Sequence, residues 1–360
     1  MRDNAFLRII LFFITLFTIL AAGTSILAYI GSHFGGFFQV FAFYGLIQPI
    51  LIILNFLLLI YWAFRFKFWF WLPLLALILN IGFIKSVYQL PGNAKKTDAI
   101  GGTPVTIGTY NVNGFCYGRR SLTASMISEF MKEKEVDILC FQEVDLDSVY
   151  TLDSLAKAFH YLPYKSYVKS KVKGFNLLLL SKYPILRSSK VRFGASGNQA
   201  MWVDLLIKKD TLRIINFHLQ TTNFNQAKFP LVPEHWIFNL SDEAKKSIGV
   251  YRVLNANSKK RFIQANFIHS IIKETPYSTL VCGDMNSNPA SYTYHQIKGH
   301  ELEDGFITCG SGYEYTIKGL KKLYRIDYIF HTKDFSGKSY KSYLLDYSDH
   351  KTVIMKLFLK

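Results

Sequence analysis

The stretch TLVCGDMN at residues 279–286 joins a buried-strand pattern to two polar residues. Thr279–Cys282 is apolar and of strand length, which is typical of a strand in a protein core. Asp284 and Asn286 then supply a carboxylate and a carboxamide. A single polar residue after a strand usually serves a turn. A functional interpretation therefore requires the same feature elsewhere in the chain.

Five other apolar runs of strand length carry a carboxylate, carboxamide or imidazole at one end or within the run. They are Val105–Tyr110 followed by Asn111, Val136–Phe141 followed by Gln142 and Glu143, Leu212–Phe217 followed by His218, Tyr324–Phe330 containing Asp327, and Thr352–Leu359 preceded by Ser348-Asp349-His350. All these side chain types bind metal ions or phosphate in proteins. Six such strands are hard to attribute to turns, and they indicate a functional site.

The order of the predicted elements indicates an α/β fold. Leu177–Leu180 and Met201–Ile207 are further predicted strands. Apolar residues at helical spacing predict two helices, Ser121–Lys134 and Ser258–Glu274. Many strands mixed with few long helices favour stacked β-sheets covered by helices.

In chain order, the motifs TYNVNG, FQE, NFHL, GDMN, RIDYI and SDH resemble the endonuclease/exonuclease/phosphatase superfamily. The resemblance extends from Thr106 to Leu359, and it depends on all six motifs together. For residues 105–360 it implies a four-layer α/β/β/α sandwich of two stacked mixed β-sheets, with the active site where the strand ends converge. It also implies a metal-dependent phosphoesterase, in which water attacks a phosphodiester in line with metal assistance.

The resemblance implies a metal site, and the residue types agree with it. Because the anionic oxygens of a phosphodiester repel nucleophiles, a divalent cation is needed to neutralise charge on the phosphoryl group. Mg²⁺, with Mn²⁺ as the alternative, prefers carboxylate and amide oxygens. Glu143 is the expected main ligand, supported by Asn111 and Asp349.

Five residues are expected to act on the substrate. Asp284 would orient or deprotonate the attacking water. Asn286 and His218 would donate to the non-bridging oxygens and stabilise the charge that builds there. By the family pattern His350 contacts the phosphate, and Asp327 orients His350 and favours its charged form.

Two alternatives remain open in this region. Asp327 lies two residues from Arg325, on the same face of the predicted strand, and could instead be the structural partner of that arginine. Cys116 and Cys309 both lie in predicted loops, and an exported domain could oxidise them to a disulfide.

Residues 1–90 have the composition of a membrane region. No Asp, Glu, Lys or Arg occurs between Arg8 and Arg65. Three apolar segments, at about 9–30, 39–64 and 68–84, are predicted transmembrane helices. The first is longer than the apolar part of a signal peptide and is soon followed by the second, which favours a retained helix. Residues 91–104, PGNAKKTDAIGGTP, are typical of a linker.

Positive charges in the short loops predict the orientation of these segments. Arg2 and Arg8 precede the first, and Arg65 and Lys67 separate the second from the third. The positive-inside rule then places both groups in the cytoplasm. Three crossings put the catalytic domain outside the cytoplasm. In a cell with an outer membrane, that compartment is the periplasm. The third segment is short and is followed by Lys85, and without its crossing the domain would be cytoplasmic.

The net charge of the soluble part indicates which binding partners are expected. Of 42 Lys and Arg and 25 Asp and Glu, the first 96 residues hold 7 and 1, so residues 97–360 carry a net charge of +11. This favours a phosphorylated polyanion, either nucleic acid or a lipid headgroup, with the bilayer as the other partner. No obligate protein partner is indicated. Residues 219–257 mix aromatic and basic residues and are interpreted either as a substrate or membrane rim or as an inert insertion.

The composition also excludes some classes of protein. Half the chain is apolar, which excludes an intrinsically disordered chain. Four Cys residues in 360 exclude a small disulfide scaffold. The alternative to an enzyme is a catalytically silent, membrane-anchored binding protein that retains the fold. The complete set of motif residues argues against it.

Overall fold

The chain divides into two compact units. The computed structural model describes residues 2–91, 102–115, 120–172, 174–194, 196–222, 242–319 and 322–360, so most of the predicted linker lies outside the described residues. One unit comprises Met1–Ser86 with Asn288–His295, and the other comprises Val87–Ser287 with Gln296–Lys360. Each unit is described separately below.

The larger unit contains two six-stranded sheets among its described residues. The first has the order β13 (Phe335–Tyr343), β14 (Thr352–Leu359), β2 (Thr103–Asn111), β3 (Ile138–Val144), β5 (Asn176–Ser181) and β4 (Tyr164–Val168). The second has the order β10 (Leu302–Asp304), β12 (Asp327–Thr332), β9 (Ser278–Asp284), β8 (Asp210–His218), β7 (Gln199–Ile207) and β6 (Ile185–Arg192). A short pair, β1 (Tyr88–Gln89) and β11 (Gly312–Tyr313), is separate.

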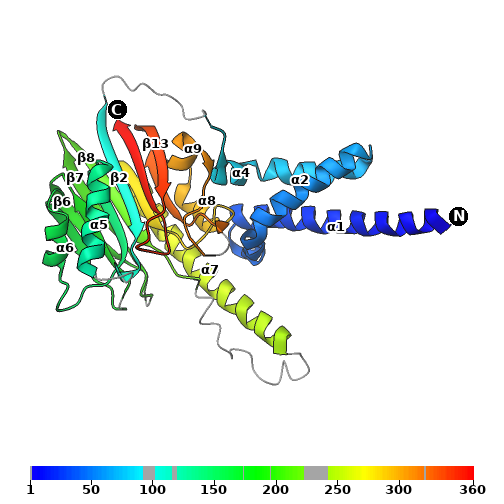
Figure 1. Cartoon of the computed structure of the whole chain (residues 1–360), viewed down its shortest axis with the longest axis horizontal. Helices are drawn as coiled ribbons and strands as arrows, with labels where there is room; N and C mark the ends of the chain where they lie inside the picture. The colour runs from blue at the N-terminus through cyan, green and yellow to red at the C-terminus, as the bar shows by residue number, and fades with distance from the viewer. Residues whose placement is uncertain are drawn as a thin grey trace. The chain divides into compact units, whose positions relative to one another are not determined.

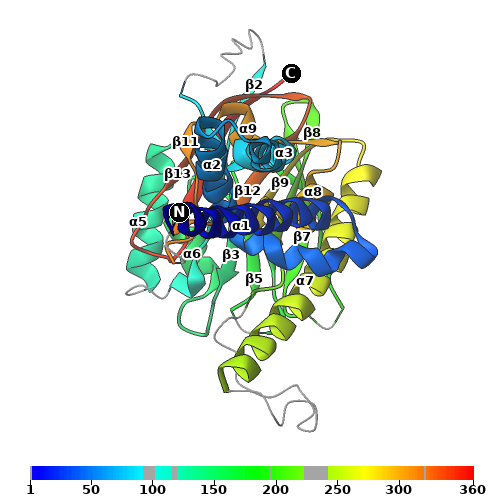
Figure 2. The same cartoon turned by 90° about the vertical axis from the view of Figure 1, so that its right-hand side faces the viewer.

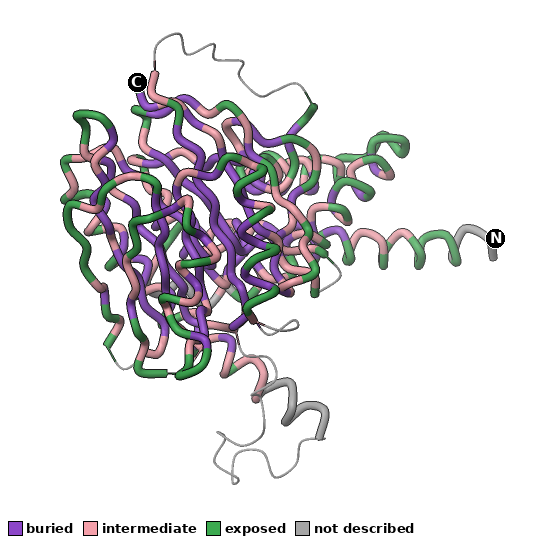
Figure 3. The backbone as a smooth tube through the Cα atoms, turned by 60° about the vertical axis from the view of Figure 1, so that its left-hand side comes forward, coloured by how far each residue is buried: buried purple, intermediate pink, exposed green. Residues whose placement is uncertain are grey.

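Both sheets are mixed, as the sequence predicted. β2 pairs with β3 and β8 pairs with β9 in parallel, whereas the other strand pairs are antiparallel. The inner faces of the two sheets form one apolar core, which includes Ile107, Leu179, Ile214 and Leu280. Figure 3 shows the strands as the buried interior of this unit.

Helices cover the outer faces and complete the four layers. α5 (Arg120–Glu133) and α6 (Leu152–Ala158) pack on the first sheet through a second apolar cluster that includes Ile127 and Leu155. α7 (Asp242–Glu274) lies on the other flank, as Figures 1 and 2 show. Among the described residues this unit also contains α9 (Gly305–Cys309) and the short 3₁₀ turn η3 (Asn113–Phe115), and α8 (Tyr292–Lys298) begins in the Asn288–His295 segment of the smaller unit.

The second long helix begins earlier than predicted. Ser258 was the expected start, whereas α7 begins at Asp242 and takes in the last part of the 219–257 segment. Residues 223–241 of that segment lie outside the described residues, so its interpretation as a rim or an inert insertion stays open.

The smaller unit is helical and apolar. It contains α1 (Arg2–His33), the 3₁₀ helix η1 (Gly36–Ile47), α2 (Gln48–Phe64), the short η2 (Phe68–Phe70), α3 (Trp71–Leu79) and α4 (Ile81–Val87). Among the described residues, Phe6–His33 and Phe43–Phe64 are long and apolar enough to cross a membrane. The predicted third segment is not one straight helix, because Phe68–Leu79 and Ile81–Val87 meet at 56°.

Polar side chains join the helices of this unit to one another. Gln48 of α2 donates to the Ser25 hydroxyl of α1 at 2.9 Å, and Trp62 donates to Thr18 at 2.8 Å. Asn80, at the break between α3 and α4, donates to the Ser25 carbonyl at 3.3 Å. Such hydrogen bonds hold apolar helices together where lipid provides no hydrophobic driving force. α1, α2 and α3 accordingly pack against one another (Figure 2).

Candidate active site

Strand register brings the predicted residues together. Asp284 pairs with His218 across the parallel strands β8 and β9, and with Asp327 across the antiparallel strands β9 and β12. In the other sheet Asn111, the last residue of β2, pairs with Gln142 of β3. Since polar side chains of both sheets are in hydrogen-bond contact here, they form one site.

A β-bulge positions Glu143. The pairing of β3 with β5 shifts between Phe141 and Val144, and Glu143 has a φ of 56° inside this irregularity. Bulges redirect side chains and are frequent beside active sites. A positive φ costs energy for a residue other than glycine, so the surrounding structure must hold Glu143 in this conformation.

The GDMN turn is equally constrained. Gly283 has a φ of 140°, and a Cβ atom there would lie 2.0 Å from the carbonyl oxygen of Phe217, so only glycine fits. Asn286 has a φ of 51°. Its backbone N–H donates to Asp284 Oδ1 at 2.8 Å, and its side-chain amide donates to the Leu219 carbonyl at 3.1 Å. The turn thereby aims both polar side chains at the same region.

Asn111 links the carboxylates of the two sheets. Its Nδ2 donates to Glu143 Oε1 at 2.9 Å and to Asp284 Oδ2 at 3.0 Å. Its Oδ1 accepts from the backbone N–H of Asn113 at 3.1 Å. Asn111 therefore holds Glu143 and Asp284 side by side and is fully buried itself.

Two histidines lie near the same carboxylate oxygen of Asp284. His350 Nδ1 is 2.9 Å from Asp327 Oδ2, and its Nε2 is 3.8 Å from Asp284 Oδ2. His218 Nε2 is 3.4 Å from Glu143 Oε1 and 3.6 Å from Asp284 Oδ2. His218 is buried, and neither ring nitrogen has a hydrogen-bond partner among the described residues. Its Nε2 is thus available to a ligand between the carboxylates.

Burial and neighbouring charges shift the pKa values of four titratable groups of the site. Burial lowers the pKa of His350, but the Asp327 and Asp284 charges outweigh it and raise that pKa to about 10. Burial, together with the Asp327 charge, raises the pKa of Asp284 to about 6. Burial also raises the pKa of Glu143 and lowers that of His218. The site is therefore rich in carboxylates that a bound cation would stabilise in their charged form.

The donor set fits a divalent cation. Two overlapping groups of possible ligand atoms, each within 4.8 Å of one another, are Glu143–His218–Asp284 and Asp284–Asp327–His350. Asp349 belongs to neither group. Its Oδ1 accepts from Asn113 Nδ2 at 3.2 Å, although its charge affects the pKa values of both Glu143 and His350.

A buried layer beneath the site contains positioning residues to which the sequence assigned no role. Gln142 Nε2 donates to Asn216 Oδ1 at 2.8 Å and to Thr109 Oγ1 at 3.0 Å. Asn216 Nδ2 donates to the Phe141 carbonyl at 3.1 Å. These bonds connect the two sheets next to Glu143 and His218. The available signal was a carboxamide directly after one apolar run, Gln142 of FQE, and one inside another, Asn216 of NFH.

Four further hydrogen bonds fix the loops that carry catalytic candidates. Ser348 Oγ donates to the Asn111 carbonyl at 2.7 Å and accepts from the His350 N–H at 3.1 Å. Arg261 of α7 donates to the Gln220 carbonyl at 2.9 Å, while Gln264 accepts from the Gln220 N–H at 2.9 Å. The sequences after His218 and before β14 are therefore tied to the rest of the fold.

The alternative partner for Asp327 is wrong. Arg325 is fully buried and forms a bidentate ion pair with Asp304, at 2.6 and 2.8 Å. Asp327 is left to hydrogen-bond His350. The proposed Cys116–Cys309 disulfide is not tested, because Cys116 lies outside the described residues, and Cys309 is a buried free thiol.

Comparison with known proteins agrees with this geometry. The family model described as Endonuclease/Exonuclease/phosphatase family matches residues 108–350. A second model, for a domain of unknown function, matches residues 8–87. No curated protein matches the chain in sequence.

Several solved structures share the fold at low sequence identity. An endonuclease/exonuclease/phosphatase family protein from Bacteroides thetaiotaomicron is 16% identical with a TM-score of 0.52, covering 72% of this chain and 99% of that one. Its counterpart from Bacteroides vulgatus is 19% identical with a TM-score of 0.52, covering 72% and 100%. The catalytic domain of human Nocturnin, solved with bound sulfate, is 16% identical with a TM-score of 0.52, covering 71% and 94%.

Proposed function

Because the chain belongs to the endonuclease/exonuclease/phosphatase family, we propose that it is a membrane-anchored, Mg²⁺-dependent hydrolase of phosphodiesters. Members of this family are hydrolases that act on phosphoester bonds. The observation that carries the proposal is the direct contact between the polar residues of both sheets through Asn111, Glu143 and Asp284. A silent binding protein would have no need to maintain this arrangement.

The metal site is proposed at Glu143. Glu143 would be the principal ligand, with Asn111 and Asp349 supporting it, and Mn²⁺ is the alternative occupant. The donor chemistry supports a hard cation, since these residues offer carboxylate and amide oxygens. When bound, the metal supplies neutralisation of charge on the phosphoryl group.

The protein side chains have separate proposed roles around the phosphate. Asp284 accepts the proton of the attacking water. Its pKa is raised to about 6, which makes its carboxylate a stronger base than that of an ordinary Asp. Asn286 and His218 donate to the non-bridging oxygens as charge develops. His350 is held cationic by Asp327 at 2.9 Å and stabilises the same charge.

The test is hydrolysis of bis(4-nitrophenyl) phosphate by the full chain in detergent micelles. Release of nitrophenolate with Mg²⁺, its loss with EDTA and its recovery with added Mg²⁺ are expected. The matched control is Asp284→Asn, which keeps the shape of the side chain but cannot accept a proton. Equal rates with Mg²⁺ and EDTA would contradict the proposal, as would equal rates for the variant.

Membrane anchoring is proposed from the smaller unit. Many of its large apolar side chains are exposed, including Phe12, Leu20, Ile53 and Phe56. Such a surface is costly in water and is typical of contact with lipid. If the bent pair Phe68–Leu79 and Ile81–Val87 crosses once, the catalytic domain lies outside the cytoplasm, in the periplasm of a cell with an outer membrane.

The substrate is proposed to be a phosphorylated polyanion. The net charge of +11 over residues 97–360 supports an anionic partner. Nucleic acid and the phosphate of a lipid headgroup or sugar both satisfy this requirement. Assays on short oligonucleotides and on phospholipid vesicles with the same enzyme preparation separate them.

A further inference from the structure

A basic pocket lies between the edge strands of the two sheets. β4 ends one sheet and β6 ends the other. The pocket has a volume of about 230 Å³ and is lined by Lys169, Lys171, Lys190, Arg192, Asn198 and Gln199, among others. Lys190 Nζ donates to the Lys169 carbonyl and so connects the β6 edge with the end of β4.

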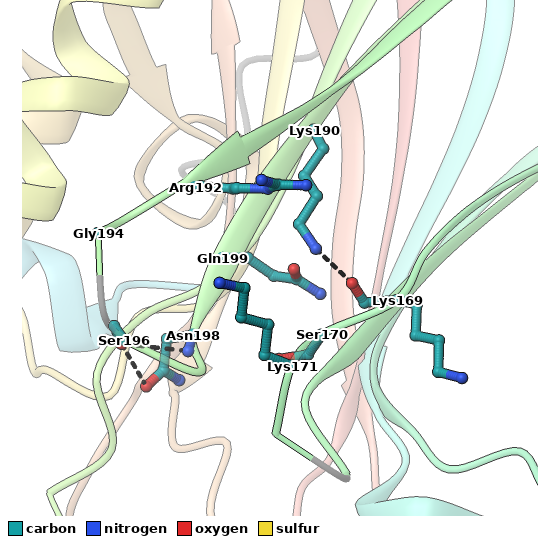
Figure 4. A pocket seen from close by; sticks show the side chains of 9 residues that line it. All are labelled: Lys169, Ser170, Lys171, Lys190, Arg192, Gly194, Ser196, Asn198 and Gln199. Carbon is teal, nitrogen blue, oxygen red and sulfur yellow. Dashed lines mark hydrogen bonds between the residues drawn. The ribbon is translucent and has the colours of Figure 1, made fainter.

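The cationic groups of this pocket converge. Lys190 and Arg192 are two residues apart in β6 and share one face of the strand. In Figure 4 the ends of Lys171, Lys190 and Arg192 point toward one space beside Gln199, whereas the amine of Lys169 points away from it. None of these four cations forms an ion pair with a carboxylate in the part of the chain that the structure describes.

The cationic side chains of this pocket repel one another. Burial lowers the pKa of Lys190, and the charges of Arg192 and Lys171 lower it further. Charged residues on edge strands also prevent sheets from pairing with other chains. That role requires only that charges face solvent along the edge. It does not explain why three of them meet above the buried amides of Asn198 and Gln199.

The pocket adjoins the active site through one carbonyl group. Asn198 Nδ2 donates to the Leu219 carbonyl at 2.8 Å, and Asn286 Nδ2 donates to the same oxygen at 3.1 Å. Gln199 also pairs with His218 across β7 and β8. The wall of the pocket is thus connected to Asn286 and His218, which are proposed to hold the scissile phosphate.

We propose that this pocket binds a second, non-scissile phosphate of the substrate. The inference rests on the proposed phosphodiesterase function and narrows it to substrates that carry at least two phosphate groups. Cations without carboxylate partners are suited to a phosphate, and Arg192 offers the paired donors that suit its oxygens. Without a metal ion, the carboxylates of the active site would repel a phosphate, whereas the cations of the pocket would attract one. The scissile and the non-scissile phosphate are therefore proposed to bind at separate sites.

Binding without catalysis gives the first test. Pyrophosphate is titrated calorimetrically into the full chain in detergent with EDTA, so that no divalent metal contributes. Lys171→Gln/Arg192→Gln is expected to weaken binding at least about tenfold, because hydrogen bonds to charged groups are worth more than neutral ones. The matched control, Lys209→Gln/Lys333→Gln, removes two exposed charges at the opposite end of β8 and β12 and should bind as the wild type does. Equal binding by the pocket variant and the wild type would overturn the proposal, as would no binding by the wild type.

Kinetics with Mg²⁺ then test the link to the substrate. Thymidine 5′-(4-nitrophenyl phosphate) is compared with the same compound carrying a 3′-phosphate, and phosphatidylinositol with phosphatidylinositol 4-phosphate in mixed micelles. The added phosphate should lower KM in one of the two pairs, and that pair shows whether the second phosphate belongs to a nucleotide or to a lipid headgroup. In the pocket variant the added phosphate should no longer lower KM, while kcat is retained. An added phosphate without effect in either pair would overturn the link. If no substrate is cleaved while pyrophosphate binding depends on the pocket, the phosphodiesterase function fails and the anion site stands.

Discussion

Replacing Arg325 by methionine tests an ion pair that is fully buried in the larger unit. The Arg325 guanidinium donates to both Asp304 oxygens at 2.6 and 2.8 Å, and both side chains are 0% exposed. Arg325→Met keeps an unbranched apolar side chain at this position but removes the guanidinium and its charge. The Asp304 carboxylate then remains buried, with the Phe306 N–H at 3.0 Å as one of its remaining contacts.

The expected loss is large because the remaining charge cannot reach water. Breaking one side of a buried ion pair costs about 3–5 kcal/mol. For a unit of this size that corresponds to a fall in Tm of roughly 10 °C. Asp304→Asn/Arg325→Met removes both charges, while the amide oxygen of the substituted side chain still caps α9, so most of the stability should return.

Differential scanning fluorimetry of the full chain in detergent measures these changes. Lys356→Met is the control for an exposed pair. It breaks the contact with Glu135 at 2.7 Å, where the side chains are 37% and 77% exposed. That change should lower Tm far less than Arg325→Met does, because exposed ion pairs contribute little to stability. If Arg325→Met and the double variant are equally unstable, the buried charge is not the cause of the loss and the reasoning is refuted.

Four further predictions concern catalysis and topology. Glu143→Ala should abolish hydrolysis through lost metal binding with little change in Tm, and full turnover at ordinary Mg²⁺ concentrations would contradict the ligand assignment. Asp284→Asn should lose most of kcat while KM changes little in steady-state assays, because an amide cannot accept the proton of water. His350→Ala should lose on the order of 10²-fold or more in kcat, as expected for one charge-stabilising donor; near wild-type kcat would mean that the SDH motif has been misinterpreted. Alkaline phosphatase fused after Lys360 should be active and a fluorescent protein that requires the cytoplasm should be dark, whereas the opposite pair of results would place the domain inside.

Central strands were predictable from the sequence, and edge strands were not. Each predicted apolar run corresponds to a strand in the structure, because a strand covered on both faces has to be apolar throughout. β4, β6, β10 and β13 had no predicted counterpart, and all four are the terminal strands of their sheets. An edge strand has one side open to solvent and carries polar residues, so it lacks an apolar run.

The candidate site was predictable for a related reason. A carboxylate, carboxamide or imidazole at the end of an apolar strand is costly unless it has partners, and this signal is local in the sequence. It indicated which side chains to consider, from Asn111 to His350. It did not indicate the partners themselves. The local pattern left Asp327 two residues from Arg325 and 23 from His350, and the family resemblance alone implied the pairing with His350 that the structure has, at 2.9 Å.

The sequence by itself therefore determined the apolar helices, the central strands and the residue types at their ends, since each depends on neighbouring residues along the chain. The tertiary structure alone decided that Asn111 bridges Glu143 and Asp284, that Arg325 pairs with Asp304, and that the cations of β6 meet the end of β4. These contacts depend on strand register and on how two sheets stack. Both arise from interactions between residues far apart in the chain, which leave no local pattern.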